Sequence, residues 1–109
     1  MHELAITQET IEAVLARAGA AQVTRVTLEI GRLSAVLPDA VRTCFELCRE
    51  DTPLRATELT IIETPGVARC TACGAELQLD RPFGRCACGC SDLEWLAGEE
   101  LRIREMEVI

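Results

Sequence analysis

The sequence contains no lysine, so arginine alone supplies its eleven basic residues. Acidic residues number 18, and the formal net charge of the 109-residue chain is −7. Phosphate backbones and anionic membrane surfaces repel a negative chain, and we therefore expect neither a nucleic acid nor a membrane as partner. The chain also lacks a G-x-x-x-x-G-K-[ST] loop, which removes the usual means of holding nucleotide phosphates.

Aromatic residues and histidine are scarce as well. The chain has no tyrosine, one tryptophan, two phenylalanines and a single histidine, His2. A nucleophile–histidine pair would have to use that residue at the chain end, so we expect no enzymatic activity. No apolar run approaches the roughly 20 residues of a membrane helix, and the N-terminus has no basic flank or apolar signal core. We expect a cytoplasmic protein that is a monomer or a weak dimer.

Apolar residues follow helical and strand-like periods along most of the chain. Hydrophobic residues make up 49% of the sequence, which is enough apolar material for one core. The spacing predicts helices over residues 3–18 and from Pro38 onward, and strands over residues 23–30 and 58–63. A third strand follows Gly98, where the alternation of apolar and polar residues returns.

A cysteine-rich insertion interrupts this pattern. Residues 65–97 hold five of the seven cysteines and few aliphatic residues, so they cannot support an apolar core of their own. We predict an α+β fold: two helices packed on a three-stranded sheet, with an inserted four-cysteine, zinc-ribbon-like domain. The main domain then comprises residues 1–64 plus 98–109. Alternation in the last strand slips between Ile103 and Met106, which predicts a β-bulge there.

The cysteines of the insertion form two groups with the spacing of metal ligands. The first reads Cys70-Thr-Ala-Cys73-Gly, the second reads Cys86-Ala-Cys88-Gly-Cys90, and twelve residues separate Cys73 from Cys86. A Cys-x-x-Cys-Gly turn directs two thiolates to one point, and two such turns form a tetrahedral sulfur site. In the second group three thiols compete for two positions.

Zinc in such a site would be structural, because four thiolates leave no position for an activated water. Iron in the same four-sulfur cage is the main competing interpretation. A redox Cys-x-x-Cys is disfavoured, because no thioredoxin-like βαβ pattern surrounds it. Cys44 and Cys48 lie one turn apart on the apolar face of the second predicted helix, and we interpret them as buried packing residues.

The N-terminus reads Met1-His2-Glu3. The terminal amine, the amide nitrogen of His2 and its imidazole can close adjacent chelate rings on one ion. Three nitrogens in a plane with a fourth donor suit square-planar Ni(II) or Cu(II). Glu3 could supply that donor through its amide or its carboxylate. On chelate geometry alone, a histidine placed at position two by chance remains the simpler interpretation.

Several motifs in order resemble the HypA/HybF family of hydrogenase maturation factors. They are the opening Met-His-Glu, the segment Leu-Glu-Ile-Gly-Arg-Leu-Ser, the two cysteine groups, and the ending Gly-Glu-Glu-Leu-Arg-Ile-Arg-Glu-Met-Glu-Val. The resemblance implies a nickel metallochaperone for [NiFe]-hydrogenase and, in some organisms, urease. It also implies nickel at His2, with the Met1 amine and Glu3 beside it. A HypB-like GTPase and the hydrogenase large subunit are the implied partners.

The resemblance also bears on the zinc ligands. Cys70 and Cys73 match the first zinc pair of the family, whereas the second pair departs from the commoner Cys-Pro-x-Cys-Gly. Here Cys86-Ala-Cys88-Gly is one residue shorter and lacks the proline. We take Cys86 and Cys88 as the second pair and keep Cys90 as the alternative ligand. The competing functions are a zinc-ribbon regulatory or nucleic-acid/protein interaction module and a rubredoxin-like electron carrier.

Overall fold

The computed structural model describes residues 2–109, apart from the side chain of His2. The chain forms two compact units. Unit 1 comprises the residues up to Glu29 together with Val36–Ile62 and Arg102–Ile109, and unit 2 comprises Ile30–Ala35 and Glu63–Leu101. Unit 2 thus contains the cysteine-rich segment and also residues 30–35, which the sequence did not associate with it. The domain boundaries inferred from sequence remain a prediction.

Two helices form in unit 1, as predicted. Helix α1 (His2–Ala18) ends before Gly19, whose φ of 57° is easily adopted without a Cβ and whose N–H donates to Leu15 O at 3.1 Å. Helix α2 (Pro38–Cys48) begins with a proline and has an aspartate in its first turn. No helix among the described residues is long and apolar enough to cross a bilayer.

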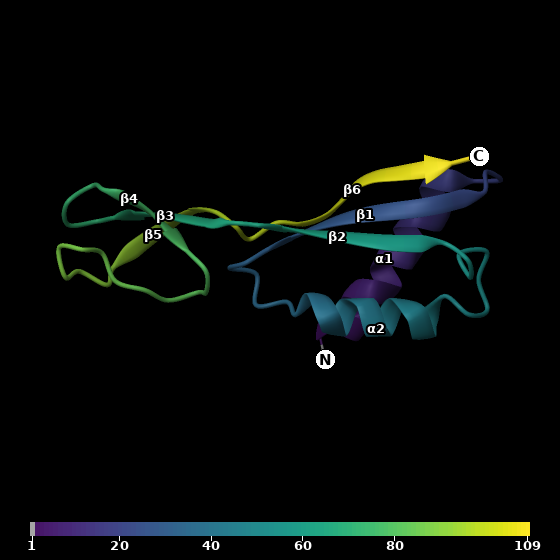
Figure 1. Ribbon diagram of the computed structural model, residues 1–109, viewed down its shortest axis with the longest axis horizontal. Helices are drawn as coiled ribbons and strands as arrows, with labels where there is room; N and C mark the ends of the chain where they lie inside the picture. The colour runs from purple at the N-terminus through teal and green to yellow at the C-terminus, as the bar shows by residue number, and fades with distance from the viewer. Residues whose placement is uncertain (1) are drawn as a thin grey trace. The chain divides into compact units, whose positions relative to one another are not determined.

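The main sheet has three strands in the order β2-β1-β6. Its strands are β1 (Val23–Gly31), β2 (Glu58–Thr64) and β6 (Leu101–Val108). In Figure 1 the chain leaves β1, returns through α2 and then enters β2. Strands β1 and β2 therefore run in the same direction, and β6 runs opposite to them. This confirms the predicted α+β class with two helices and a three-stranded sheet.

The core of unit 1 lies between the helices and the sheet (Figure 1). Both helices and strands β1 and β2 contribute buried apolar side chains; they are Ile11, Val14, Val41, Phe45, Val26, Leu28 and Leu59. The opposite face of the sheet carries ion pairs instead. There Arg102 donates to Glu29 Oε2 at 2.9 Å, and Arg25 lies between Glu58 and Glu107. One face is therefore apolar and the other charged.

The predicted bulge in the last strand is not found. Leu33 N donates to Gly98 O at 2.8 Å near the start of the β1–β6 pairing, and Ile109 N donates to Gln22 O at 3.0 Å at its end. Both bonds fit one regular antiparallel register through the described strands, so the prediction near Arg104 was wrong. Apolar residues in this strand simply occur on both of its faces.

Unit 2 contains a second, smaller sheet of order β4-β3-β5. Its strands are β3 (Gly66–Cys70), β4 (Glu76–Leu79) and β5 (Leu93–Ala97), and β3 pairs antiparallel with both neighbours. Its apolar contacts are few: Leu33, Ala68 and Leu79 are buried, with Leu77 and Leu93 packed against them. So small a core supports the inference that this segment needs a further source of stability.

Candidate metal centre

The first cysteine pair lies in a tight turn at the end of β3. Cys70 N donates to Ala75 O, and Gly74 N donates to Cys70 O, both at 2.9 Å. The turn requires φ of 76° at Gly74, a value that a residue with a Cβ adopts only with strain. Cys70 is buried and Cys73 is exposed. The glycine after the second cysteine therefore allows the chain to turn back with both sulfurs on one side.

The second pair lies in a loop closed by its own backbone. Cys86 N donates to Cys90 O at 2.9 Å, and Gly89 N donates to Cys86 O at 2.8 Å. Gly89 has φ of 96°, which again favours glycine. Arg85 Nη1 donates to Gly89 O at 2.9 Å and adds a side-chain bond to the loop. The shortened second group therefore still forms a turn that presents two sulfurs.

The sulfur atoms of the four cysteines Cys70, Cys73, Cys86 and Cys88 all lie within 4.8 Å of one another. Cys70 Sγ lies 3.6 Å from Cys88 Sγ, and Cys73 Sγ lies 3.6 Å from Cys86 Sγ. A zinc ion with Zn–S bonds of about 2.3 Å places neighbouring sulfurs about 3.8 Å apart in a regular tetrahedron. The observed spacing is close to that edge length, so the cage fits a tetrahedral thiolate ion.

Cys90 lies outside this four-sulfur group. Its sulfur accepts a hydrogen bond from Asp92 N at 3.4 Å and lies 3.8 Å from Asp92 O, to which its S–H donates. Cys44 and Cys48 also lie outside the group; both are half-buried on α2. Cys48 lines a cavity of about 510 Å³ between the two helices.

The close approach of the four thiols gives them different pKa values. The pKa of Cys70 falls to about 6, mainly because the backbone N–H of Cys73 donates to its sulfur. The backbone N–H of Cys90 acts in the same direction on Cys88, but the neighbouring thiols of Cys70 and Cys86 outweigh it and raise the pKa of Cys88 to about 12. Four thiolates in so small a space need a cation to offset their mutual repulsion, and a divalent ion supplies that charge.

A contact between the first cysteine turn and the segment after the second could not have been found from the sequence. Thr71, within the first turn, donates through Oγ1 to both the backbone oxygen and Oδ2 of Asp92 at 3.0 Å. Its backbone N–H also donates to Asp92 O at 3.2 Å. These bonds tie the first turn to the segment after the second one. A threonine and an aspartate 21 positions apart give no local signal for such a contact.

The other predicted site lies at the start of α1. The nickel ligands predicted there, Met1 and the side chain of His2, lie outside the described residues. Glu3 is described: its Oε2 accepts a hydrogen bond from Leu37 N at 3.2 Å. This carboxylate therefore lies at the N-terminal end of α2, where the helix dipole favours a negative charge.

Comparison with known proteins gives a consistent picture over the whole chain. A family model described as "Hydrogenase/urease nickel incorporation, metallochaperone, hypA" matches residues 1–108. The hydrogenase maturation factor HypA of Nostoc punctiforme is 50% identical over 108 residues, covering 99% of this chain and 96% of the relative. That of Geobacter metallireducens is 47% identical over 109 residues, covering 99% of both chains.

Two solved structures are similar in fold. The solution structure of the Ni metallochaperone HypA from Helicobacter pylori matches with a TM-score of 0.65 and 22% sequence identity, over 98% of this chain and 97% of that one. A second solution structure, of HypA protein, matches with a TM-score of 0.64 and 24% identity, over 100% of this chain and 97% of that one.

Proposed function

The chain belongs to the HypA family of nickel metallochaperones for hydrogenase maturation, and on this premise we propose that it binds Ni(II) at its N-terminus and zinc in its four-cysteine site. The single observation that carries the proposal is the family match, which extends from the opening Met1-His2-Glu3 to Val108. Delivery to [NiFe]-hydrogenase, and to urease where that enzyme is present, is the finer function that we propose.

Nickel binding rests on the donors at the start of α1. The Met1 amine, the His2 amide and the His2 imidazole provide three nitrogens in adjacent chelate rings, as square-planar nickel requires. Backbone N–H groups in the first turn of a helix have no intrahelical acceptor. A metal ion can therefore replace the amide proton there without breaking a hydrogen bond of α1. Because the Glu3 carboxylate already accepts from Leu37 N, we assign the fourth donor to the Glu3 amide.

Zinc would have a structural role in this scheme. Cys70, Cys73, Cys86 and Cys88 would fill a tetrahedral coordination sphere and leave no open position for catalysis. Metal binding on the order of 10 kcal/mol would offset the small apolar core of unit 2. We propose no catalytic activity for the chain itself.

The proposed partners are a HypB-like GTPase and the hydrogenase large subunit, because a metallochaperone must receive or release its ion by contact with other proteins. We place this action in the cytoplasm. The seven cysteines form no disulfide within the described residues, which is consistent with a reducing compartment.

Metal analysis of untagged protein tests the proposal directly. Protein as purified should be colourless and contain about one zinc per chain, and after nickel loading it should contain about one additional nickel. Stoichiometric iron with a visible charge-transfer band would instead indicate a rubredoxin-like centre. Failure to take up nickel while zinc is present would leave a zinc-ribbon interaction module as the better interpretation.

A further inference from the structure

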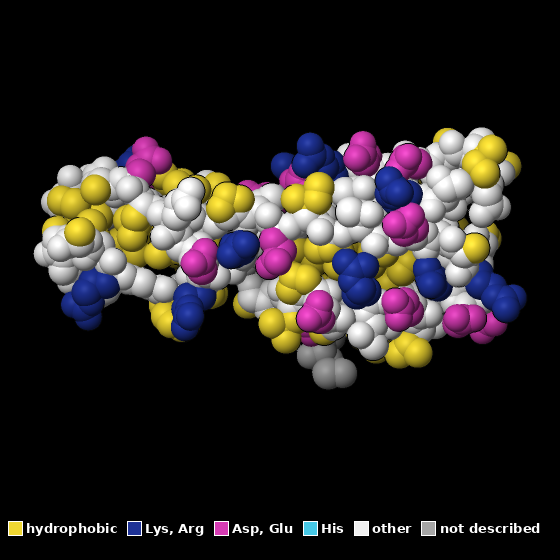
Figure 2. All heavy atoms as spheres, viewed as in Figure 1, with side chains coloured by type: hydrophobic (Ala, Val, Ile, Leu, Met, Phe, Trp, Pro, Cys, Tyr) yellow, Lys and Arg dark blue, Asp and Glu magenta, His cyan; other side chains and the backbone are white. Residues whose placement is uncertain are grey.

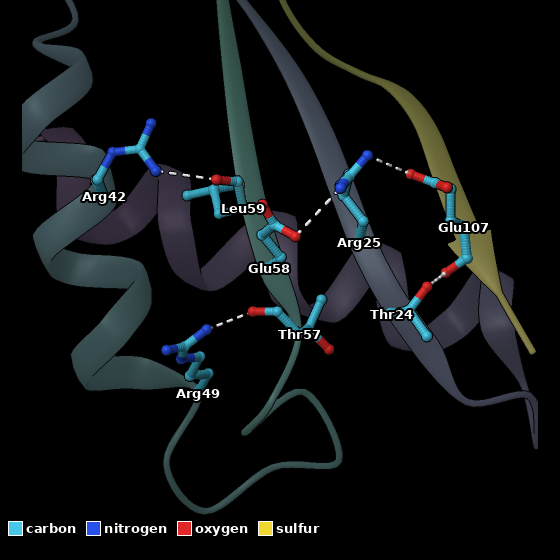
Figure 3. A network of polar contacts seen from close by, with 8 residues as sticks. All are labelled: Thr24, Arg25, Arg42, Arg49, Thr57, Glu58, Leu59 and Glu107. Carbon is cyan, nitrogen blue, oxygen red and sulfur yellow. Dashed lines mark hydrogen bonds and ion pairs between the residues drawn. The ribbon is translucent and has the colours of Figure 1, made fainter.

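Two arginines, Arg42 in α2 and Arg49 directly after the helix, reach across to the backbone of β2 (Figure 3). Arg42 Nη1 donates to Leu59 O at 2.9 Å, and Arg49 Nη1 donates to Thr57 O. Strand β2 lies at one edge of its sheet, with β1 as its neighbour on the other side. Long cationic side chains therefore occupy backbone acceptors that a strand at a sheet edge would otherwise leave to solvent or to another chain.

The alternation of the strand shows which side these carbonyls face. Arg32 N, just after β1, donates to Thr64 O at 3.0 Å, so the carbonyl of Thr64 points toward β1. Carbonyl directions alternate along a strand, and Thr57 and Leu59 are an odd number of positions from Thr64. Their carbonyls therefore point to the free edge, as do the amides of Leu59 and Ile61.

A groove runs between α2 and this edge. It encloses about 360 Å³ and is lined in part by Arg42, Phe45 and Arg49. The guanidinium carbon of Arg49 lies 5.5 Å from the ring centre of Phe45, and its buried Nε has no hydrogen-bond partner among the described residues. A buried donor without an acceptor is unfavourable, and an acceptor group entering the groove would remove that cost.

Charge in the groove favours an anionic ligand. Two carboxylates, Glu46 and Glu58, also line it, and Glu58 forms an ion pair with Arg25 at 3.3 Å outside the arginine pair. Figure 2 shows acidic and basic side chains interspersed over α2 and the neighbouring strands. The two arginines are therefore a local cationic pair on a chain whose net charge is −7.

We propose that the free edge of β2 is a docking site for an extended segment of a protein partner that carries two carboxylates at alternate positions. The carboxylates take Arg42 and Arg49, and the segment pairs with the backbone groups thus released. A guanidinium bonds a carboxylate more strongly than a neutral carbonyl, so the exchange is favourable. Thr57 and Leu59 are two residues apart, which matches side chains at i and i+2 on one face of the incoming strand. The inference does not depend on either metal.

Titration with short acetylated peptides tests this site. The probe has a β-branched sequence with glutamates at i and i+2, and its matched control has glutamines there. The glutamate peptide should bind the full-length protein at least about tenfold more tightly. In nuclear magnetic resonance spectra it should shift the amides of Leu59 and Ile61, and hydrogen exchange at Ile61 should slow.

Three variants show whether the arginines recognise the carboxylates. Arg42→Gln and Arg49→Gln should each remove the preference for glutamate over glutamine. Arg55→Gln is the matched control, because Arg55 is an exposed arginine paired only loosely, at 3.9 Å, with Glu50. Arg49 also stacks on Phe45, so Arg42→Gln provides the answer if Arg49→Gln does not fold.

Several results would overturn the proposal. Equal affinity for the two peptides, or no binding of either, would mean that the arginines only protect the edge from pairing. Inorganic phosphate that displaces the peptide and causes the same shifts alone would indicate a simple anion site. Glu105 and Glu107 of β6 have the required spacing, so sedimentation of the protein alone is needed. Self-association that peptide abolishes would identify a second copy as the occupant.

Discussion

The sulfur of Cys70 lies 3.6 Å from the sulfur of Cys88, although the two residues are 18 positions apart in the chain. Cys73 and Cys86 form an equivalent contact across the two turns. Each turn thus contributes one sulfur to each close pair, as two opposite edges of a tetrahedron require. A single ion at the centre would be held equally by both turns and would join β3 to the loop before β5.

This geometry predicts unequal effects of substitution in the second cysteine group. Cys86→Ser should lose zinc or bind it far more weakly, because it removes a member of the four-sulfur cage. Cys90→Ser should retain about one zinc per chain, since its sulfur bonds to Asp92 instead. Zinc content of dialysed protein measures both. The reverse order of zinc loss would show that Cys88 and Cys90 form the second pair.

Zinc binding should release a number of protons that depends on pH. In the metal-free protein the pKa of Cys70 is about 6, below its ordinary value, so this thiol is ionised at neutral pH and protonated in acid. Zinc displaces a proton from Cys70 only when the pH is below the pKa of this thiol. Proton release should therefore be greater by about one at pH 5 than at pH 7.5, and the affinity should fall as pH falls. Calorimetry in buffers of different ionisation enthalpy measures the release; an unchanged number would contradict the lowered pKa of Cys70.

The thiols on α2 should affect stability and not metal content. Replacing both Cys44 and Cys48 with alanine should lower the free energy of unfolding by about 1–3 kcal/mol, because both are half-buried apolar groups. Denaturant unfolding with zinc bound measures the loss. Both metals should still bind in normal amounts, and loss of zinc from this double variant would show that the ligands were assigned wrongly.

A HypB-like GTPase from the same organism should bind the full-length protein. We expect the contact to be made mainly by unit 1, so Cys86→Ser, which disrupts the zinc site of unit 2, should reduce affinity only modestly. A binding assay with and without nickel, in each nucleotide state, measures this. Absence of binding in every condition would argue strongly against the proposed partner.

Sequence periodicity predicted the main sheet and helices well, because each has a local signal. Gly19 marks the end of α1, and Pro38 marks the start of α2. The small sheet of unit 2 had no such signal, because its strands are short and its core is mostly formed by contacts between distant residues such as Leu33 and Leu79. The bulge was a misreading of a strand whose apolar residues do not all face the core.

The four cysteines were predictable as a group from their spacing, but the outer position of Cys90 depends on loop geometry. Its carbonyl accepts from Cys86 N, and its thiol bonds to Asp92, and neither contact follows from residue type. The arginine contacts with β2 were also inaccessible from sequence. Nothing in the residue types of Arg42 and Arg49 indicates these contacts until α2 is placed beside the edge of the sheet.

Nickel titration of three forms of the protein tests the central claim most directly. The forms are the native N-terminus, a long acetylated extension before Met1, and His2→Ala. The native form should bind about one Ni(II) with the yellow, low-spin spectrum of planar four-nitrogen coordination. Affinity should fall steeply as the pH is lowered, because the amine and the amides of His2 and Glu3 must each lose a proton. The other two forms should bind nickel weakly, with zinc unchanged in all three. Nickel binding by His2→Ala as tight as that of the native protein would contradict the N-terminal site.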